Sequence, residues 1–497
     1  MNRSAGIFLH PTSLPSPFGI GDMGAAAYDW ITLLSKNNQS YWQICPLGPT
    51  GYGDSPYQCL STFAGSELLI SPAKLLEEGL LSREEIEAYP SLPEEHVDFG
   101  AVVREKEKLF RKAYSRFVDF DEFGKFCEEE KYWLDNYALF RVIKQKNKDK
   151  AWNAWDAPLK LSYPATLNSL KEFEYAEIRY RKFLQYFFHR QWRQLKAYAG
   201  SQGISIIGDI PIYTAFDSAD SWSMPDYFEF DESCNPTKVA GVPPDYFSAT
   251  GQLWGNPIYK WDYMRDNRYS WWISRIKKTL QLVDVIRLDH FRGFESFWAI
   301  PVNRPDAVQG EWMAGPGIDF FNQLRQALGD LPLIAEDLGN ITPQVIGLRQ
   351  AVGIPGMKVL QFAFDGDPTN WHLPYNVVSD NIVYTGTHDN DTTLGWFTKL
   401  EKKGKKIVLD FLGCPQETMM EHFIRMAYAT SAMLCIVPLQ DVLALDSSHR
   451  MNTPGTMSGN WQWRVTIDML RTHGLDKMEM VGDFSGIYGR LPNPLRQ

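Results

Sequence analysis

Eight short apolar runs, each ending in polar residues, recur along this chain of 497 residues. Each run has the length of a strand, and its β-branched and aromatic residues suit a strand that is covered on both faces. The runs are AGIFLHPTS, YWQICPLGP, ISIIGDIP, VDVIRLDH, LPLIAEDLG, MKVLQFAFD, NIVYTGTHDND and CIVPLQDVL.

Helical patterns separate several of these runs. They cover residues 24–37, 319–330 and 342–353, and the last begins with Thr342 and Pro343, a capping residue and a first-turn proline. Strands that alternate with helices in this way predict a (β/α)8 TIM barrel in the α/β class. In such a barrel the carboxyl ends of the strands carry the chemistry.

Two connections are too long for ordinary barrel units, so we expect residues 1–497 to form one catalytic barrel with two insertions. Residues 60–200 are mostly charged and helical in pattern, and predict a helical insertion after the second strand. Residues 210–283 form the second insertion, after the third strand, and include GVPPDYFSATGQLWGNPIY, which is rich in Gly, Pro and aromatic residues. We interpret this segment as a lid; a structural Ω-loop is the alternative.

Composition excludes several classes of protein. The formal net charge is −10 and the basic residues are scattered, which argues against nucleic acid as a partner. Six cysteines form no CxxC pair, as expected for reduced thiols in a cytoplasm. No apolar run approaches the ~18 residues that a membrane span needs, and no signal peptide is recognisable. We therefore expect a soluble cytoplasmic protein that does not bind membranes.

Four acidic residues stand at predicted strand ends. Asp209, Asp289, Glu336 and Asp389 follow the third, fourth, fifth and seventh runs, so their side chains should converge over one mouth of the barrel. Convergent carboxylates without a metal-ligand pattern favour glycoside chemistry, in which one acid is the nucleophile and another the proton donor. The alternative for any single acid is a helix cap or a solvated loop residue.

The neighbours of these acids suggest their roles. Arg287 lies two residues before Asp289, so both point to one side of the strand, and the cation should keep Asp289 ionised as a nucleophile requires. Glu336 follows Leu-Ile-Ala with no adjacent cation, so its pKa should rise, as a proton donor requires. We expect His290, His388 and Asp389 to hydrogen-bond sugar hydroxyls. A metal site built on His10 and His388 is the alternative, but no HExxH or comparable spacing supports it, and we predict no metal.

The chain is also rich in aromatic residues, with 17 Trp, 23 Tyr and 29 Phe, many of them in apparent loops. Loop aromatics favour a ligand with flat faces, although large rings also simply fill a large core. In the predicted lid, Tyr246, Phe247 and Trp254 offer rings for stacking on sugars, and Gln252 offers a hydrogen-bonding amide.

Six longer motifs carry a resemblance to a known family: GPTGYGDSPYQ, GVPPDYFSATGQLWGNPIY, RLDHFRG, AEDLG, TGTHDND and MNTPGT, the last followed by GNWQWR. Together they span about Gly6 to Arg464 and resemble the 4-alpha-glucanotransferases of glycoside hydrolase family 77. These enzymes are called amylomaltase in bacteria and disproportionating enzyme in plants, and are related to the α-amylases. The resemblance implies retaining transfer of a segment of an α-1,4-glucan or maltooligosaccharide to the 4-hydroxyl of an acceptor, without a cofactor.

The resemblance also implies roles for single residues. Asp289 would be the nucleophile, Glu336 the acid and base, and Asp389 the carboxylate that stabilises the transition state. The donor sugar site would be lined by Tyr57, Asp209, Arg287 and His388, and the lid over the acceptor side would contain Gln252 and Trp254. The chain departs from the family pattern at Phe216, Ala249 and Leu253, where His, Glu and often Arg are usual, so acceptor preference and lid closure are open.

Two rival functions remain. An α-glucan hydrolase shares this chemistry and differs only in whether water or sugar resolves the intermediate. A catalytically silent glucan-binding protein would need the aromatic residues but not the acids, so the presence of Asp289, Glu336 and Asp389 argues against it. We expect a monomer or a weak homo-oligomer.

Overall fold

The computed structural model describes residues 3–244, 248–456 and 458–492, and its centre is a closed barrel of eight strands. All neighbouring pairs in the barrel are parallel. Each of the eight apolar runs overlaps one strand, which confirms the predicted barrel. The strands are β1 (Ser4–Phe8), β2 (Tyr41–Gln43), β3 (Ser205–Ile210), β6 (Val285–Leu288), β9 (Leu333–Ala335), β10 (Gly356–Val359), β11 (Asn381–Tyr384) and β12 (Leu434–Pro438).

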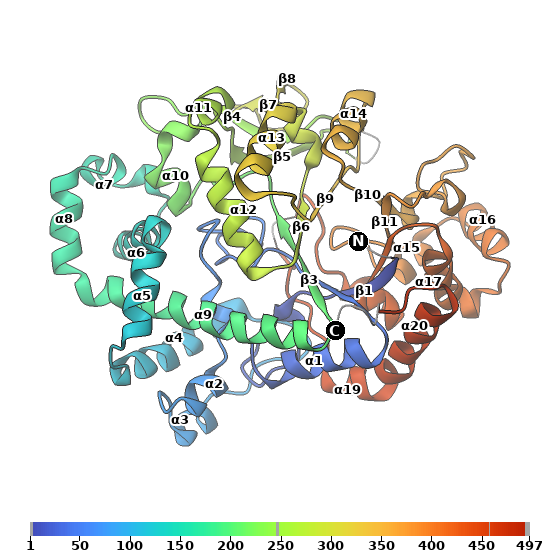
Figure 1. Cartoon of the computed structure of the whole chain (residues 1–497), viewed down its shortest axis with the longest axis horizontal. Helices are drawn as coiled ribbons and strands as arrows, with labels where there is room; N and C mark the ends of the chain where they lie inside the picture. Colours follow the sequence, from blue (N-terminus) through green and yellow to red (C-terminus); the bar gives the residue numbers. More distant parts are fainter. Residues whose placement is uncertain (1–2, 245–247, 457, 493–497) are drawn as a thin grey trace.

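Helices surround the barrel (Figure 1). The three predicted helices form: α1 (Ala25–Lys36), α13 (Gly317–Leu328) and α14 (Pro343–Val352), the last with the Thr342 hydroxyl accepting from Val345 N–H. The other helices of the barrel and its C-terminal part are α12 (Ser270–Leu282), α15 (Thr393–Lys399), α16 (Lys402–Leu412), α17 (Met419–Ala429), α18 (Leu439–Val442), α19 (Ile467–Met469) and α20 (Leu475–Ile487).

One barrel unit departs from the strand and helix alternation. Between β10 and β11 the structure has only two short 3-10 turns, Leu360–Phe362 and Pro374–Asn376. This connection contains Gly366, Pro368 and Pro374, which disfavour a continuous helix.

The connection from β2 to β3 is a helical subdomain, drawn in blue to green in Figure 1. Its longest helix, α9 (Tyr175–Ser201), packs against α1 and against other helices of the subdomain. Phe117 lies within 5.1 Å of the Phe123 and Phe183 ring centroids, so aromatic contacts hold these helices together. The helices are α2 (Pro72–Glu77), α3 (Arg83–Glu87), α4 (Phe99–Arg116), α5 (Asp121–Glu129), α6 (Lys131–Lys146), α7 (Ala157–Lys160), α8 (Pro164–Phe173) and α9 (Tyr175–Ser201).

A second, antiparallel sheet lies outside the barrel and was not predicted. Its order is β5-β4-β7-β8, with β4 (Lys238–Val242), β5 (Gln252–Pro257), β7 (Ser296–Pro301) and β8 (Glu311–Ala314). The predicted lid segment is therefore largely a hairpin of β4 and β5 that is anchored in this sheet. Two short helices flank the hairpin in the chain, α10 (Ala219–Ser223) and α11 (Trp261–Asp266).

Alternation along the barrel strands decides which side chains reach the mouth. Ile207, Val285 and Ile334 lie in one buried cluster, while their neighbours Ile206, Ile286 and Leu333 lie in the other. Side chains alternate between the two faces of a strand, so residues two positions apart point to the same face. The residues two positions after Ile207, Val285 and Ile334 therefore also point into the barrel, nearer its mouth. Those residues are Asp209, Arg287 and Glu336. Among the described helices, none is long and apolar enough to cross a membrane.

Candidate active site

Arg287 forms the centre of the charged side of the barrel mouth. It is the register partner of Asp209 across the parallel pair of β3 and β6, so the two side chains start side by side. Its Nη1 lies 2.5 Å from Asp209 Oδ2 and 2.9 Å from Asp289 Oδ1. One buried guanidinium nitrogen thus bridges both carboxylates. The predicted placement of Arg287 beside Asp289 is confirmed.

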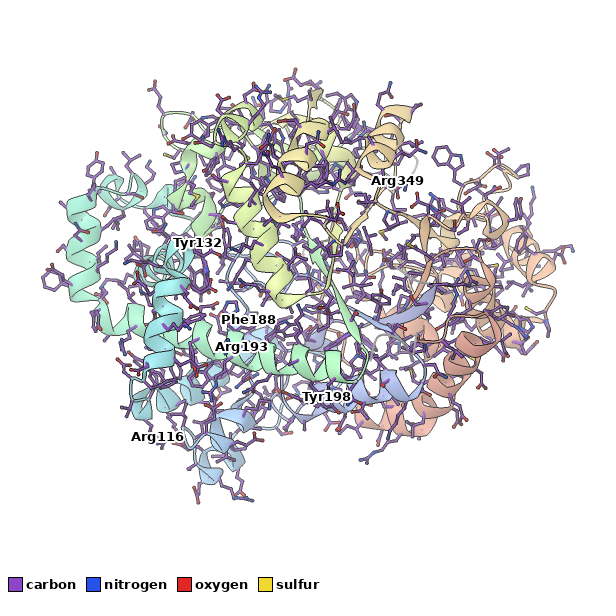
Figure 2. The ribbon with its side chains drawn as sticks, viewed as in Figure 1. Arg116, Tyr132, Phe188, Arg193, Tyr198 and Arg349 are labelled. Atoms are coloured by element: carbon purple, nitrogen blue, oxygen red, sulfur yellow. The ribbon has the colours of Figure 1, made fainter. Side chains whose placement is uncertain are left out.

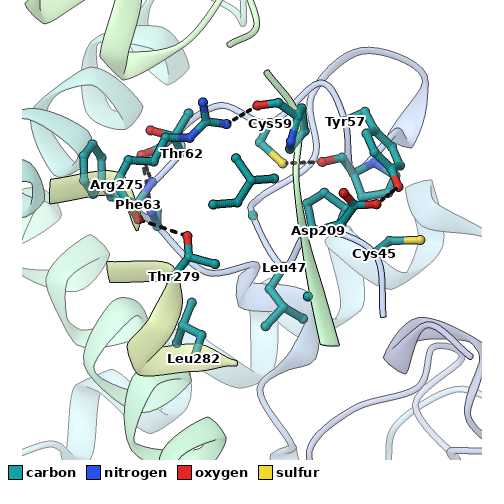
Figure 3. Close-up of a pocket in the computed structure, with 18 of the residues that line it drawn as sticks. Cys45, Leu47, Tyr57, Cys59, Thr62, Phe63, Asp209, Arg275, Thr279 and Leu282 are labelled. Atoms are coloured by element: carbon teal, nitrogen blue, oxygen red, sulfur yellow. Dashed lines mark hydrogen bonds between the residues drawn. The ribbon is translucent and has the colours of Figure 1, made fainter. Parts of the chain in front are cut away.

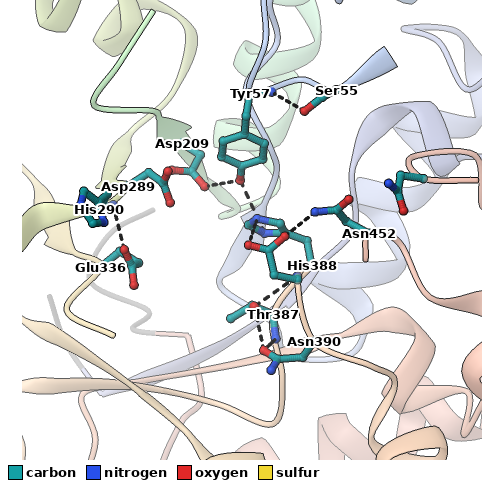
Figure 4. Close-up of polar contacts among 12 residues, drawn as sticks. Ser55, Tyr57, Asp209, Asp289, His290, Glu336, Thr387, His388, Asn390 and Asn452 are labelled. Atoms are coloured by element: carbon teal, nitrogen blue, oxygen red, sulfur yellow. Dashed lines mark hydrogen bonds and ion pairs between the residues drawn. The ribbon is translucent and has the colours of Figure 1, made fainter. Parts of the chain in front are cut away.

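Tyr57 connects this charged side to His388 (Figure 4). Its hydroxyl donates to Asp209 Oδ2 at 2.7 Å and lies 3.5 Å from His388 Nδ1, and its ring stacks on the His388 ring with centroids 4.9 Å apart. Burial raises the pKa of Asp209 to about 6 against the opposing charge of Arg287, so Asp209 is ionised at neutral pH.

Glu336 lies in a different environment on the neighbouring strand. It follows the end of β9 and accepts two backbone hydrogen bonds, from His290 N–H at 2.8 Å and from Leu338 N–H at 3.0 Å. Burial raises the pKa of Glu336 to about 8, and the charge of Asp289 adds to this, although Arg287 and the two N–H groups oppose it. Glu336 therefore holds a proton at neutral pH, as its apolar sequence context predicted.

The backbone at His290 is what allows this contact. His290 has a φ of 51°, in the left-handed region, so the chain turns sharply just after Asp289. The turn places the His290 N–H against Glu336 and the imidazole against Trp254 of the β4–β5 hairpin. Burial lowers the pKa of His290 to about 4, so its ring is neutral.

Asp389 stands at the open side of the mouth, with its side chain 48% exposed. It accepts from Asn452 Nδ2 at 2.6 Å and lies 3.4 Å from His388 Nε2. Burial acts to raise its pKa, but His388 and Asn452 outweigh burial and lower the pKa to about 2. For His388, burial acts to lower the pKa, but Asp389 outweighs it and raises the pKa.

The β4–β5 hairpin reaches the site through Trp254. Its ring meets the His290 ring edge to face, with centroids 4.8 Å apart, and its Nε1 donates to Gln252 Oε1 at 3.1 Å. Trp254 and Gln252 are thus positioned together on β5. Tyr246 and Phe247, the other predicted stacking rings, lie outside the described residues.

A cavity of about 70 Å³ lies behind Tyr57 and Asp209 (Figure 3). Cys45, Cys59 and Arg275 also border it, and the Oδ1 of Asp209 has no hydrogen-bond partner among the described residues. The volume exceeds the ~10–15 Å³ that a single ordered water needs, so the cavity can admit water beside that oxygen.

Sequence reasoning missed several groups of the site. Asn452 was not assigned a role, although it belongs to the MNTPGT motif; no local pattern connects it with Asp389, 63 residues away. The two backbone N–H groups that donate to the Glu336 carboxylate were also missed, because these hydrogen bonds depend on the backbone conformation. Within the described ranges, no group of three or more His, Cys, Asp or Glu side chains is arranged to hold a metal ion.

Comparisons with known proteins identify the family of this chain. A family model described as 4-alpha-glucanotransferase matches residues 9–469. The chain is 47% identical to the 4-alpha-glucanotransferase of Synechocystis sp., over 94% of this chain and 95% of the relative. It is 44% identical to that of Thermus thermophilus, over 93% and 95%.

A solved structure is similar over nearly the whole chain. Amylomaltase from Streptococcus agalactiae in complex with acarbose superposes with a TM-score of 0.95 at 37% identity, covering 98% of this chain and 100% of that one. The barrel, its mouth of acids and these relatives lead to one conclusion: the chain belongs to the 4-alpha-glucanotransferase family.

Proposed function

We propose that the acids of the mouth divide the work of a retaining glucan transfer, with Asp289 as nucleophile and Glu336 as acid and base. The observation that carries this assignment is the contrast between the two carboxyl groups. Asp289 is in contact with the Arg287 guanidinium, whereas the pKa of Glu336 is raised to about 8. A retaining glycosidase needs one ionised and one protonated carboxyl group on either side of the scissile bond.

In the first step, an Asp289 oxygen attacks the anomeric carbon of the donor glucosyl unit. The bond from that carbon to the glycosidic oxygen breaks, and Glu336 gives its proton to the departing 4-oxygen. The products are a shortened glucan with a free 4-hydroxyl and a glycosyl ester on Asp289. Arg287 stays beside the ester and stabilises the carboxylate before and after the step.

In the second step, the 4-hydroxyl of an acceptor glucan attacks the same carbon from the opposite face. The Glu336 carboxylate takes its proton, the ester bond breaks, and Asp289 is regenerated. We assign Asp389, His388, Tyr57 and Asp209 to the hydroxyls of the donor sugar. This role suits groups that already hydrogen-bond one another around the open side of the mouth.

Transfer must outcompete hydrolysis, because water is present at roughly 55 M whereas sugar acceptors are millimolar. An acceptor wins only if it is held in place and water is poorly admitted. Trp254 and Gln252 are the candidates for holding it, since the hairpin brings Trp254 against His290 and Trp254 hydrogen-bonds Gln252. We further propose that the substrates are maltooligosaccharides and the linear chains of starch or glycogen. We place the protein in the cytoplasm, where its six free cysteines stay reduced.

Incubation with maltotriose alone tests this function. The expected products are glucose and longer maltooligosaccharides, with a nearly constant number of reducing ends. Steadily rising reducing ends would identify a hydrolase instead. Trp254→Ala should raise the ratio of hydrolysis to transfer, while Trp371→Ala, an exposed tryptophan on the β10–β11 connection, should leave it unchanged. Equal ratios in all three proteins would remove Trp254 from the explanation.

A further inference from the structure

A groove of about 180 Å³ lies on the helical side of the molecule, away from the acids of the mouth. It is bordered by α6 of the helical subdomain, by α10 and by α12, which lie near one another in Figure 1. Tyr132, at the start of α6, marks its position in Figure 2. The volume far exceeds the ~10–15 Å³ that a single water needs, so the groove can admit a ring-sized ligand.

Aromatic rings form the floor of this groove. Phe63 is the central ring: its centroid lies 5.7 Å from that of Tyr132, 6.4 Å from that of Trp133 and 6.2 Å from that of Trp271. Phe63, Trp133 and Trp271 are at least 95% buried, whereas Tyr132 is 49% exposed. The floor is therefore held rigidly by the core, and Tyr132 stands at its rim as a ring available for stacking.

Polar groups without protein partners surround this floor. Within the described parts of the chain, the Tyr132 hydroxyl, the Asn136 side-chain amide and the Ser223 and Ser270 hydroxyls have no hydrogen-bond partner in the protein; all four residues line the groove and are at least partly exposed to solvent. The indole N–H of Trp271, a residue 95% buried, also has no partner. Ring faces bordered by unpaired donors and acceptors suit a ligand with alternating C–H faces and hydroxyls, which is the chemistry of a pyranose.

The groove is separate from the candidate active site. None of the three acids Asp289, Glu336 and Asp389 is among the residues that line the groove. The segment containing Ser61 and Phe63 forms the wall between the groove and the cavity behind Tyr57. This wall is braced, because the Asp220 carboxylate accepts from the Thr62 N–H at 2.9 Å and from its hydroxyl at 2.8 Å.

We propose that this groove is a second, non-catalytic binding site for an α-glucan, which takes one or two glucosyl units of a long chain. Tyr132 stacks on one sugar face, and Asn136, Ser223 and Ser270 bond its hydroxyls. A chain held there keeps its other segments near the barrel mouth at a raised effective concentration, so long glucans gain and short ones do not. The choice of an α-glucan rests on the transfer function proposed above.

Binding to long glucans and turnover of short ones separate the two sites. Retardation in gels containing glycogen is measured in the Asp289→Asn background, which prevents turnover of the matrix. Tyr132→Ala and Asn136→Ala in that background should each weaken glycogen binding about fivefold or more, the loss of one strong contact. Tyr175→Ala, an exposed tyrosine at the start of α9, is the matched control and should bind like the parent.

The same substitutions in the active protein should leave maltotriose disproportionation unchanged. Unaltered glycogen retardation in both groove variants would overturn the proposal, as would an equal loss of maltotriose turnover, which would place the groove on the catalytic path. Sugar density over Tyr132 in crystals of the Asp289→Asn variant soaked with maltoheptaose is expected; density at the barrel mouth alone would count against the groove. Absence of maltotriose transfer in the unmodified protein would instead refute the function itself.

Discussion

Two carboxyl groups at the ends of neighbouring barrel strands, Asp289 after β6 and Glu336 after β9, have opposite surroundings. Asp289 shares one nitrogen of Arg287 with Asp209, in a cluster that Tyr57 extends. Glu336 has no ion pair among the described residues and is held by two backbone N–H groups. The pKa of Glu336 is raised to about 8 by burial, whereas its neighbour faces a permanent cation.

This contrast shows that environment rather than residue type divides the chemistry. Register places Arg287 opposite Asp209 and on the same face as Asp289, so the cation serves the β3–β6 side of the mouth. Glu336 comes directly after β9, whose residues Leu333 to Ala335 are all apolar. This strand therefore contributes no cation beside Glu336. Two acids a strand apart therefore have different electrostatic surroundings, as the roles of acid and nucleophile require.

The largest expected effect comes from removing the nucleophile. Asp289→Asn keeps the shape and hydrogen bonding of the side chain but cannot form the glycosyl ester, so transfer from maltotriose should fall by about 10⁴-fold or more. Calorimetry should still detect maltooligosaccharide binding. Asp262→Asn, a change at an exposed acid in α11, is the control and should retain full activity. Loss of binding in proportion to rate would make Asp289 structural.

Removal of the proton donor should be almost as severe but open to chemical rescue. Glu336→Gln should lower maltotriose transfer by about 10³-fold, since general acid catalysis contributes roughly 10²–10⁴. α-Maltosyl fluoride needs no proton donor and azide needs no base, so together they should restore turnover in this variant. They should not restore it in Asp289→Asn, and rescue of both variants alike would erase the distinction between the two acids.

Replacement of Arg287, the cation that Asp289 and Asp209 share, should affect Asp289 more than Glu336. Arg287→Lys keeps the charge but cannot place one nitrogen against both carboxylates and another toward Met357 Sδ, so kcat/KM should fall about 10²-fold. The alkaline limb of the pH profile should persist, because Lys keeps the positive charge that opposes the raised pKa of Glu336. A near-normal rate would show that Arg287 does not support Asp289 during catalysis.

The pH profile should show the proton on Glu336. Its pKa of about 8 in the free protein implies that kcat/KM for maltotriose falls about tenfold per pH unit above that value. The loss should be reversible when the pH is returned to 7. A flat profile to pH 10, measured with the protein still folded, would contradict the assignment of Glu336 as acid.

The smallest effect concerns stability. The folded-state pKa of Glu336 is raised above its ordinary value of 4.5, so the folded protein retains a proton that the unfolded chain releases, and stability falls as pH rises toward 8. Glu336→Gln removes this dependence. The Tm of the variant minus that of the unmodified protein should therefore increase between pH 6.5 and 9. This window lies above the pKa of Asp209, so titration of that residue does not contribute. A constant Tm difference would mean that Glu336 is not protonated in the folded state.

The barrel and its acids could be predicted from the sequence because both depend on local patterns. A buried parallel strand needs consecutive apolar residues, and a side chain just after it must stand at the mouth, so Asp289 and Glu336 were assigned without knowledge of contacts. The antiparallel sheet was missed because its strands β4, β5, β7 and β8 lie on both sides of β6 in the chain, and because β5 and β8 are only partly buried and so lack a continuous apolar run.

The sequence by itself therefore determined the eight strands, the four acids at their ends and the pairing of Arg287 with Asp289, all of which follow from periodicity and short spacing. Only the tertiary structure decided that Asn452 supports Asp389, that His290 N–H holds Glu336, and that rings from α6 and α12 meet Phe63 in one groove. Each of these contacts joins residues at least 46 positions apart. Such contacts depend on how buried surfaces close around one another, and no local pattern records that.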